Sequence, residues 1–233
     1  MIYVMGGPRG NHTKYAEMLN KLKLDDEKDA LFVLGNVIGD TADSIDILKD
    51  MMYRQNIFPV LGSNEFFAKT VLPELTQAKT LEDCAKCISA ENKGMLASWV
   101  ERGGYKMIAQ FLSLDSEGRE SIIDYLEEFA PYEEVDAGGR TFVLTHSGIR
   151  NFQPEKELDD YSEADFVFDR ADFSKIYFKD RFLVTAGEPT KNIPGGKDGK
   201  VFSAKRHLAV LCCEDASERL AAVCLDTLKV SYC

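Results

Sequence analysis

Short apolar runs alternate with amphipathic segments over the first 61 residues of the chain. The apolar runs 2–5, 30–34 and 57–61 have the length of β-strands. The run 30–34 is apolar at every position, which predicts a strand buried on both faces of a sheet. Segments 11–22 and 43–55 instead place their apolar residues at helical spacing. This order predicts a βαβαβ unit built on a parallel sheet.

A helical stretch and then a series of strands make up the rest of the pattern. Residues 66–129 have helical character, broken by turn-forming residues. Two strand-like segments then flank Gly138-Gly139, which is the signal of a hairpin. The later strands are expected to pair mostly antiparallel, and an acidic, aromatic-rich connection at 151–180 interrupts them. The strands expected in this half are 132–136, 140–145, 182–185, 201–202, 207–212, 219–225 and 229–232.

Five loops are the expected place for any chemistry. Ligands of α/β sheets bind beyond the carboxyl ends of the strands. The loops in that position are 6–10, 35–41, 62–65, 145–150 and, after a later strand, 186–190. Functional side chains are therefore expected to converge from these five loops.

Composition narrows the class of protein. The 233 residues, 45% of them hydrophobic and 29% charged, suit a single α/β domain spanning 1–233. The formal net charge of −11 repels a phosphate backbone, so nucleic acid is not an expected partner. No apolar run approaches the ~18 residues that a membrane span needs, and no export signal is found at the start. We therefore expect a cytoplasmic protein without a membrane partner.

The cysteines suggest no metal or redox site. The pair Cys84-x-x-Cys87 has zinc-like spacing, but no second pair stands at a matching interval. We interpret it as two partly buried thiols one helical turn apart. Cys212 and Cys213 are expected on a strand, where their side chains would point to opposite faces.

The sequences of the loops carry a family resemblance. Gly35-Asn36-Val37-Ile38-Gly39-Asp40 follows the second expected strand, Gly62-Ser63-Asn64-Glu65 follows the third, and Thr145-His146-Ser147-Gly148 follows a later one. Together with 168–175 and 184–190 they resemble, in order and spacing, the calcineurin-like metallophosphoesterases of the bacterial serine/threonine protein phosphatase type. The resemblance covers essentially the whole chain. It implies an α/β sandwich of two mixed β-sheets flanked by helices, with a helical insert at about 66–130.

The resemblance also implies where a dinuclear site would be. The family holds two divalent metals, usually manganese, iron or zinc, so that a bridging water becomes a nucleophile near neutral pH. Catalytic side chains of the family match Gly39, Asp40 and Asn64 in this chain, none of which keeps the family's residue. Only His146 is retained among the ligand positions, which are Gly7, Arg9, Asn36, Ser63, His146 and Gly187.

These departures predict a loss of the family's chemistry. Loss of an outer partner alone commonly costs ~10–100-fold in metal affinity or activity, and here five of six ligand positions are changed. Neither Gly39 nor Asn64 can exchange a proton at neutral pH. We therefore expect no metal cofactor and a pseudophosphatase that binds a protein or a phosphorylated ligand.

Two alternatives stay open at this stage. A rebuilt metal site could combine His146 and Asn36 with nearby carboxylates of Asp40, Glu65 or Glu188 and give weak phosphoesterase activity.

In the other alternative, Arg9 binds an anion without metal through its planar fork of donors. Arg170, Asn36 and Asn64 are further candidates for contact with that ligand. The simpler interpretations are that Arg9 pairs with a nearby carboxylate, that Arg170 forms a surface salt bridge, and that His146 is a hydrogen-bonded residue at a strand end.

Overall fold

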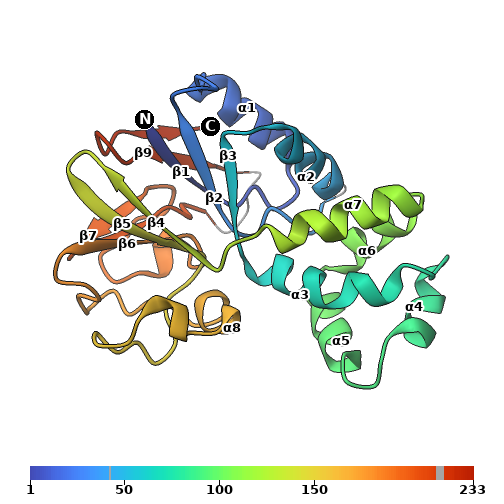
Figure 1. Ribbon diagram of the computed structural model, residues 1–233. Coiled ribbons are helices and arrows are strands. Elements are labelled where there is room, and N and C mark those ends of the chain that lie inside the picture. Colours follow the sequence, from blue (N-terminus) through green and yellow to red (C-terminus); the bar gives the residue numbers. More distant parts are fainter. Residues whose placement is uncertain (42, 214–217) are drawn as a thin grey trace.

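A computed structural model describes residues 1–41, 43–213 and 218–233. Figure 1 shows two β-sheets on one side and a group of helices on the other. The strands are β1 (Ile2–Gly6), β2 (Ala30–Leu34), β3 (Ile57–Val60), β4 (Tyr132–Ala137), β5 (Arg140–Thr145), β6 (Arg181–Thr185), β7 (Phe202–Ala204), β8 (His207–Ala209), β9 (Ala221–Cys224) and β10 (Val230–Tyr232). The helices are α1 (His12–Leu22), α2 (Ser44–Tyr53), α3 (Ser63–Val71), α4 (Leu81–Cys87), α5 (Lys93–Glu101), α6 (Tyr105–Leu112), α7 (Ser116–Glu127) and α8 (Glu163–Val167), with short 3₁₀ turns at Leu72–Leu75, Leu158–Asp160 and Thr190–Asn192.

The first sheet contains the strands of the predicted βαβαβ unit at one edge. Its order is β10-β9-β1-β2-β3, in which β1, β2 and β3 are parallel and β9 pairs antiparallel with both β1 and β10. Four of the five residues of β2 are fully buried. This confirms the prediction that an entirely apolar strand lies between two packed layers.

The second sheet is mixed. Its order is β4-β5-β6-β8-β7, with antiparallel pairing of β4 to β5 and of β7 to β8. The central pairs β5–β6 and β6–β8 are parallel. Four of the six pairings described for the late strands are antiparallel, so the expectation of mostly antiparallel pairing is confirmed, while the centre of this sheet, β5, β6 and β8, is parallel. The connections between these strands are long enough for a crossover, which parallel pairing requires.

The space between the two sheets is filled by side chains that alternate along the strands. Val4 and Leu34 of the first sheet pack with Phe142, Leu144 and Val184 of the second. The opposite face of the first sheet packs against α1, α2 and the helical insert. A smaller cluster covers the outer face of the second sheet with residues of the 149–178 connection. The prediction of an α/β sandwich of two mixed sheets flanked by helices is confirmed.

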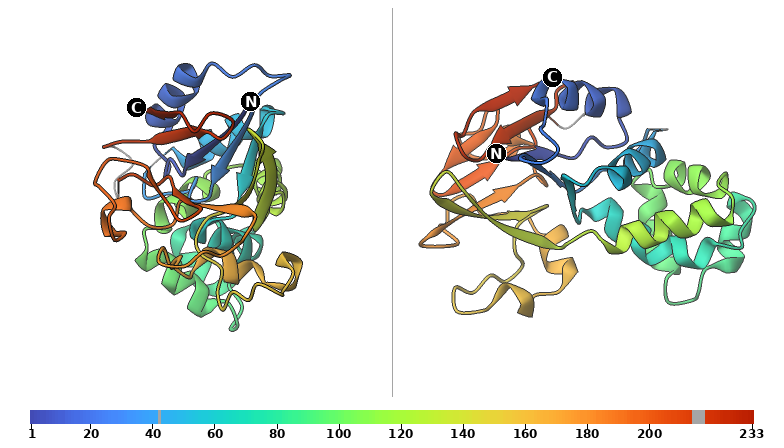
Figure 2. Two further views of the ribbon diagram at one scale, coloured as in Figure 1. Left: turned by 90° about the vertical axis from the view of Figure 1, so that its left-hand side faces the viewer. Right: turned by 45° about the horizontal axis from the view of Figure 1, so that its top comes forward.

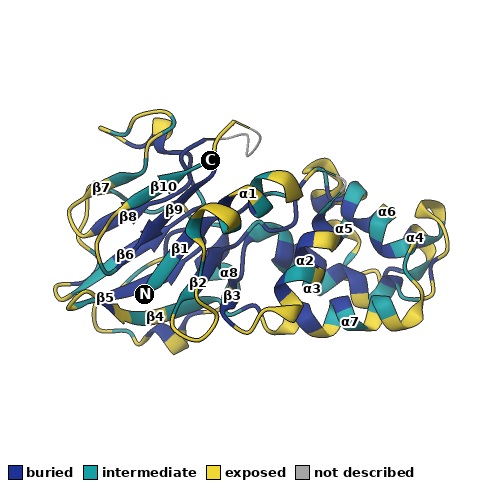
Figure 3. Cartoon of the chain, turned by 90° about the horizontal axis from the view of Figure 1, so that it is seen from above, coloured by how far each residue is buried: buried dark blue, intermediate teal, exposed yellow. Residues whose placement is uncertain are grey.

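Helices α3 to α7 form the predicted insert, which extends to one side of the sheets (Figure 1 and the right view of Figure 2). Figure 3 shows that this part is buried along the inner faces of its helices and exposed on the outer ones. Arg119 lies between its turns and donates to four backbone carbonyl groups. Among the residues that the structure describes, no helix is long and apolar enough to cross a membrane.

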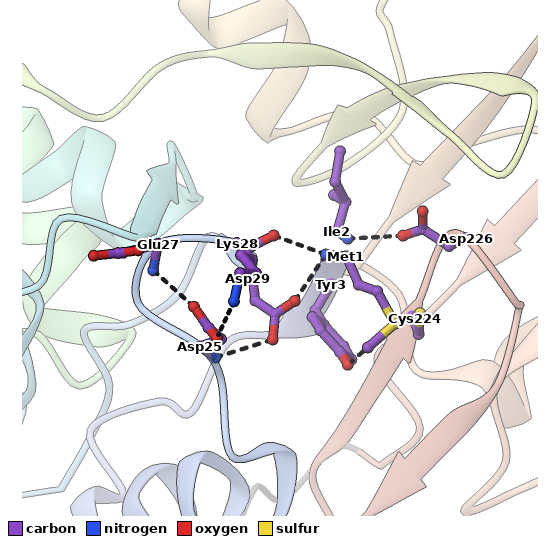
Figure 4. A network of polar contacts seen from close by, with 9 residues as sticks. All are labelled: Met1, Ile2, Tyr3, Asp25, Glu27, Lys28, Asp29, Cys224 and Asp226. Atoms are coloured by element: carbon purple, nitrogen blue, oxygen red, sulfur yellow. Dashed lines mark hydrogen bonds and ion pairs between the residues drawn. The ribbon is translucent and has the colours of Figure 1, made fainter.

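A polar network at the start of β1 joins three strands (Figure 4). The amino group of Met1 donates to the Asp29 carboxylate at 2.7 Å, just before β2. The neighbouring amide of Ile2 donates to Asp226, just after β9, at 2.8 Å. These contacts set the register at one end of the first sheet, opposite the ends of β1, β2 and β3 from which the loops of interest emerge.

Two predictions about the late strands need correction. β8 ends at Ala209 rather than at Cys212, so Cys212 and Cys213 follow the strand and are both buried with free thiols. The sequence also suggests that His207 is a strand-edge residue, but β8 lies inside the sheet between β6 and β7. Cys84 and Cys87 are free thiols on α4, as predicted.

Candidate functional site

The loops that follow β1, β2, β3, β5 and β6 meet at one place, as the sequence predicts. The loop after β1 is hydrogen-bonded to the loop after β2 through Arg9 N to Asn36 O, at 2.9 Å, and through Gly10 N to Val37 O, at 2.7 Å. The loop after β5 is joined to the loop after β6 by Ala186 N, which donates to His146 O. The positions that the resemblance matches to metal ligands are therefore gathered around a common centre.

Asn36 ties the loop after β2 to the start of α3. Its side-chain carbonyl accepts hydrogen bonds from Ser63 Oγ at 3.2 Å and from the backbone N–H of Asn64 at 3.1 Å. That N–H is one of the groups at a helix N-terminus that lack a partner within the helix. The Asn64 side chain reaches from α3 back to the loop after β2, where its Nδ2 donates to Ile38 O at 2.9 Å. Three family motif positions thus join two loops directly.

Glu65 completes this connection from α3. Its two carboxylate oxygens accept the backbone N–H groups of Asn36 and Ile38, each at 2.7 Å. The side chain is fully buried. Burial raises the pKa of Glu65 to about 7, against the opposite effect of the N–H groups of Ile38 and Asn36 that stabilise the anion. Both oxygens are therefore engaged in holding the loop.

His146, which the resemblance matches to a metal ligand, is hydrogen-bonded within the protein. Its Nδ1 lies 2.9 Å from the carbonyl oxygen of Leu34 at the end of β2. A carbonyl can only accept, so Nδ1 carries the proton in this contact. Burial lowers the pKa of His146 to about 4, and the nearby positive charge of Arg9 lowers it as well. The interpretation of His146 as a hydrogen-bonded residue just after a strand matches this geometry.

The backbone has no room for the family's aspartates at two positions. A Cβ atom on Gly7 would lie 2.0 Å from Gly35 O, and a Cβ on Gly39 would lie 1.8 Å from Arg9 O. At Gly187, where the family has its last histidine, a Cβ would lie 2.9 Å from His146 O. The aspartate side chains that the resemblance implies could enter at Gly7 and Gly39 only if the loops moved apart.

Two residues of the site have strained backbone. Arg9 and Asn36 have φ of 51° and 50°, in the left-handed region. Asparagine visits this region readily because its short side chain can bond locally, but for arginine the conformation is costly. Such strain persists only where surrounding contacts impose it. At Arg9 those contacts are the hydrogen bonds of both its N–H and its carbonyl, the latter accepting from Thr41 Oγ1 at 3.3 Å.

Arg170 and Glu188 form an ion pair at the edge of this region. Arg170 Nε lies 2.8 Å from Glu188 Oε2, and the arginine side chain is 78% exposed while that of the glutamate is 9% exposed. The pair contains a solvent-exposed guanidinium, as the surface salt bridge interpretation predicts. Asp40 lies next to Gly103 of the helical insert. Its Cβ is 3.0 Å from the position that a Cβ atom on Gly103 would occupy.

These residues do not fit a pair of divalent metals. Within residues 1–41, 43–213 and 218–233, no three His, Cys, Asp or Glu side chains are gathered so that they could hold a metal ion. Both carboxylate oxygens of Glu65 accept hydrogen bonds from backbone N–H groups, and Glu188 forms an ion pair with Arg170. His146 is engaged with Leu34. Glu65, Glu188 and His146, which were candidates for a rebuilt site, are therefore engaged with other partners.

The structural role of Glu65 was not predicted from the sequence. The sequence indicates Glu65 as a carboxylate of a rebuilt metal site, whereas it binds the loop after β2. The signal was present, because an acidic residue in the first turn of a helix is near N–H groups that need acceptors. Which N–H groups it meets depends on the packing of two loops.

Comparisons with known proteins agree with this architecture. No protein-family model matches the chain. A candidate diadenosine tetraphosphatase of known crystal structure has a TM-score of 0.66 at 12% identity, over 100% of this chain and 92% of that one. A metallophosphoesterase from Sphaerobacter thermophilus gives 0.54 at 13% identity, over 99% and 86%. A serine/threonine phosphatase from Saccharomyces cerevisiae gives 0.58 at 11% identity, over 95% and 72%.

One curated protein is similar in sequence. It is a symmetrical bis(5'-nucleosyl)-tetraphosphatase from Wigglesworthia glossinidia brevipalpis, 24% identical over 102 residues. The aligned region covers 43% of this chain and 37% of that protein, so well under half of either chain is matched. The structural similarities have low identity and therefore show a shared fold, while chemistry has to be argued from the site itself.

Proposed function

Because the chain has the fold of the calcineurin-like metallophosphoesterases, we propose that it is a pseudophosphatase, a protein of this fold that acts by binding a protein or a phosphorylated ligand rather than by two-metal hydrolysis. The observation that carries this proposal is the closure of the loops after β1 and β2. Backbone hydrogen bonds join them at Arg9 and Gly10, and Gly7 and Gly39 have no room for a side chain. A bridging water needs ligands that hold two metals at a fixed spacing.

The interactions at Asn36, Asn64 and Glu65 support the same proposal. These side chains connect the loop after β2 to α3 through five hydrogen bonds of 2.7 to 3.2 Å. Moving the loop after β2 away from α3 would break these bonds and leave buried polar groups unpaired, at ~1–3 kcal/mol for each group. The arrangement is thus stabilised without metal.

The test is metal content measured together with activity. Purified protein is analysed for metals before and after loading with manganese, and the same sample is assayed with p-nitrophenyl phosphate. We expect no stoichiometric metal and no turnover. About two metals per chain, with turnover that His146→Ala abolishes and His12→Ala retains, would overturn the proposal. His12 is an exposed residue at the start of α1 and serves as the matched control.

A metal-free anion site at Arg9 is the second candidate. The arginine backbone is held in a left-handed conformation, and its charge is close enough to lower the pKa of His146. Inorganic phosphate binding is measured by calorimetry in the wild type and in Arg9→Asn, because asparagine tolerates the same backbone. Phosphate affinity that disappears in Arg9→Asn supports this candidate. Unchanged affinity, or no phosphate binding at all, overturns it.

A further inference from the structure

A pocket of about 550 Å³ lies at the outer edge of the second sheet. It is lined by Phe173 and Ser174 from the connection after β5 and by residues of 194–205, which include all of β7. β7 is the edge strand of its sheet, so this wall of the pocket is not covered by a further strand. The volume lies within the range of ~300–1,000 Å³ that is usual for small-molecule sites. His146 and Gly187 of the former metal site do not line it.

The pocket is basic although the protein is acidic. Segment 191–206 contains five lysine or arginine residues and one acidic residue, Asp198, in a chain with a net charge of −11. Three of these basic residues, Lys197, Lys200 and Lys205, line the pocket and are exposed. A local cationic concavity raises the concentration of anions near it whatever the average charge of the molecule. An anionic ligand is therefore favoured at this place.

Two of the lysines are held in position by uncharged partners. Lys205 Nζ donates to the carbonyl oxygen of Ser174 at 3.1 Å and so joins the two walls of the pocket. Lys200 Nζ lies 5.3 Å from the centre of the Tyr232 ring. A carbonyl and a ring leave the positive charge in place, and an ammonium group has three donors. Lys205 therefore keeps donors and charge for a ligand, and the charge of Lys200 adds to the positive field at the pocket.

Two aromatic rings, one from each wall, give the pocket its apolar surface. The rings of Phe173 and Phe202 meet edge to face, with centres 5.6 Å apart and an angle of 83°. His207, buried in β8, contacts the Phe173 ring with centres 4.8 Å apart and supports it from inside the sheet. Gly195 contributes open space, since a Cβ built there meets no atom within 4 Å. Aromatic side chains at such a site accept a planar ring by stacking.

We propose that this pocket binds a nucleotide-type ligand, with its planar ring against Phe173 and Phe202 and its phosphate groups at the lysines. The combination carries the inference, because lysines alone would serve any anion and aromatic rings alone any apolar group. The inference goes beyond the proposed function: the pocket is separate from the former metal positions, and its occupancy does not depend on whether metals bind there.

The experiment compares three probes by calorimetry without divalent cations: ATP, inorganic tripolyphosphate and adenosine. We expect ATP to bind with a Kd below about 1 mM, tripolyphosphate and adenosine to bind at least about fivefold more weakly, and added salt to weaken ATP binding. Lys197→Glu should weaken ATP binding at least about tenfold. Lys93→Glu, the same charge change at the exposed start of α5, should leave it unchanged. Phe202→Leu should weaken ATP but not tripolyphosphate.

Three results would overturn the inference. The first is no ATP binding at about 1 mM. The second is an equal loss in Lys197→Glu and Lys93→Glu, which would mean a non-specific charge effect. The third is equal affinity for ATP and tripolyphosphate, which would mean that the adenine ring of ATP does not contribute to binding. If Phe202→Leu does not fold, the lysine variants and the three probes still decide. The metal analysis is independent of these measurements, so each proposal fails separately.

Discussion

Replacing Glu65 with glutamine tests the reasoning about the closed loops most directly. Glu65 is fully buried and its two oxygens accept the backbone N–H groups of Asn36 and Ile38. Burial raises the pKa of its carboxyl from 4.5 to about 7. Glutamine has a similar shape but cannot titrate, so the variant removes the pH dependence that comes from this one group.

The sign and size of the effect follow from linkage. Between pH 4.5 and about 7 the folded state holds a proton on Glu65 that the unfolded state releases. The contribution of Glu65 to the free energy of unfolding is therefore full below pH 4.5 and is lost as the pH rises through the folded pKa. At 1.36 kcal/mol for each pKa unit, the loss over this window is on the order of 3 kcal/mol.

The assay is urea unfolding of the wild type and Glu65→Gln at several pH values across this window. The difference between the two proteins is the informative quantity, because His146 and His207 act in the opposite direction. Burial lowers the pKa of both imidazoles from 6.5 to about 4, so their contributions are present above pH 6.5 and are lost as the pH falls toward 4. The wild type should lose about 3 kcal/mol relative to Glu65→Gln as the pH rises from the acid to the neutral end.

A constant difference between the two proteins would refute the reasoning. It would mean that the Glu65 carboxyl titrates at an ordinary pKa, and hence that water reaches it and the loops are open. Glu91→Gln is the control, because Glu91 is exposed at the start of the turn before α5. That variant should follow the wild type at every pH.

The remaining predictions concern backbone packing and a second buried imidazole. Gly39→Ala places a Cβ 1.8 Å from Arg9 O and should lower the free energy of unfolding by at least ~1–3 kcal/mol. Gly94→Ala in α5, where a Cβ meets nothing within 4 Å, should raise it slightly. Equal effects of the two substitutions in urea unfolding would contradict the closed-loop geometry. His207 is buried, and neither ring nitrogen has a hydrogen-bond partner among the described residues. His207→Phe should therefore move the acid unfolding midpoint, followed by circular dichroism, to lower pH, because the unfolded state no longer gains a proton there. An unchanged midpoint would show that His207 is solvated.

Strand positions and the family motifs could be read from the sequence because they depend on local pattern. The entirely apolar segment 30–34 is a strand with these same bounds, and the hairpin around Gly138-Gly139 joins β4 and β5. The direction of pairing in the second sheet could not be read, since β5, β6 and β8 are brought together by long connections. Its parallel core was therefore missed.

For the candidate site, the sequence by itself determined which residues occupy the loops after the strands, while the match of these residues to metal-ligand positions, with only His146 retained, stays a prediction. The single-domain assignment and the roles of these residues stay predictions. The tertiary structure decided how the loops pack at these positions. The backbone is in close contact at Gly7 and Gly39, and Glu65 accepts hydrogen bonds from N–H groups of the loop after β2. It also placed Phe173 beside Lys205, residues far apart in the chain, on one pocket. Residue identity is local, whereas a contact between loops depends on how two sheets pack, and the sequence pattern does not fix that packing.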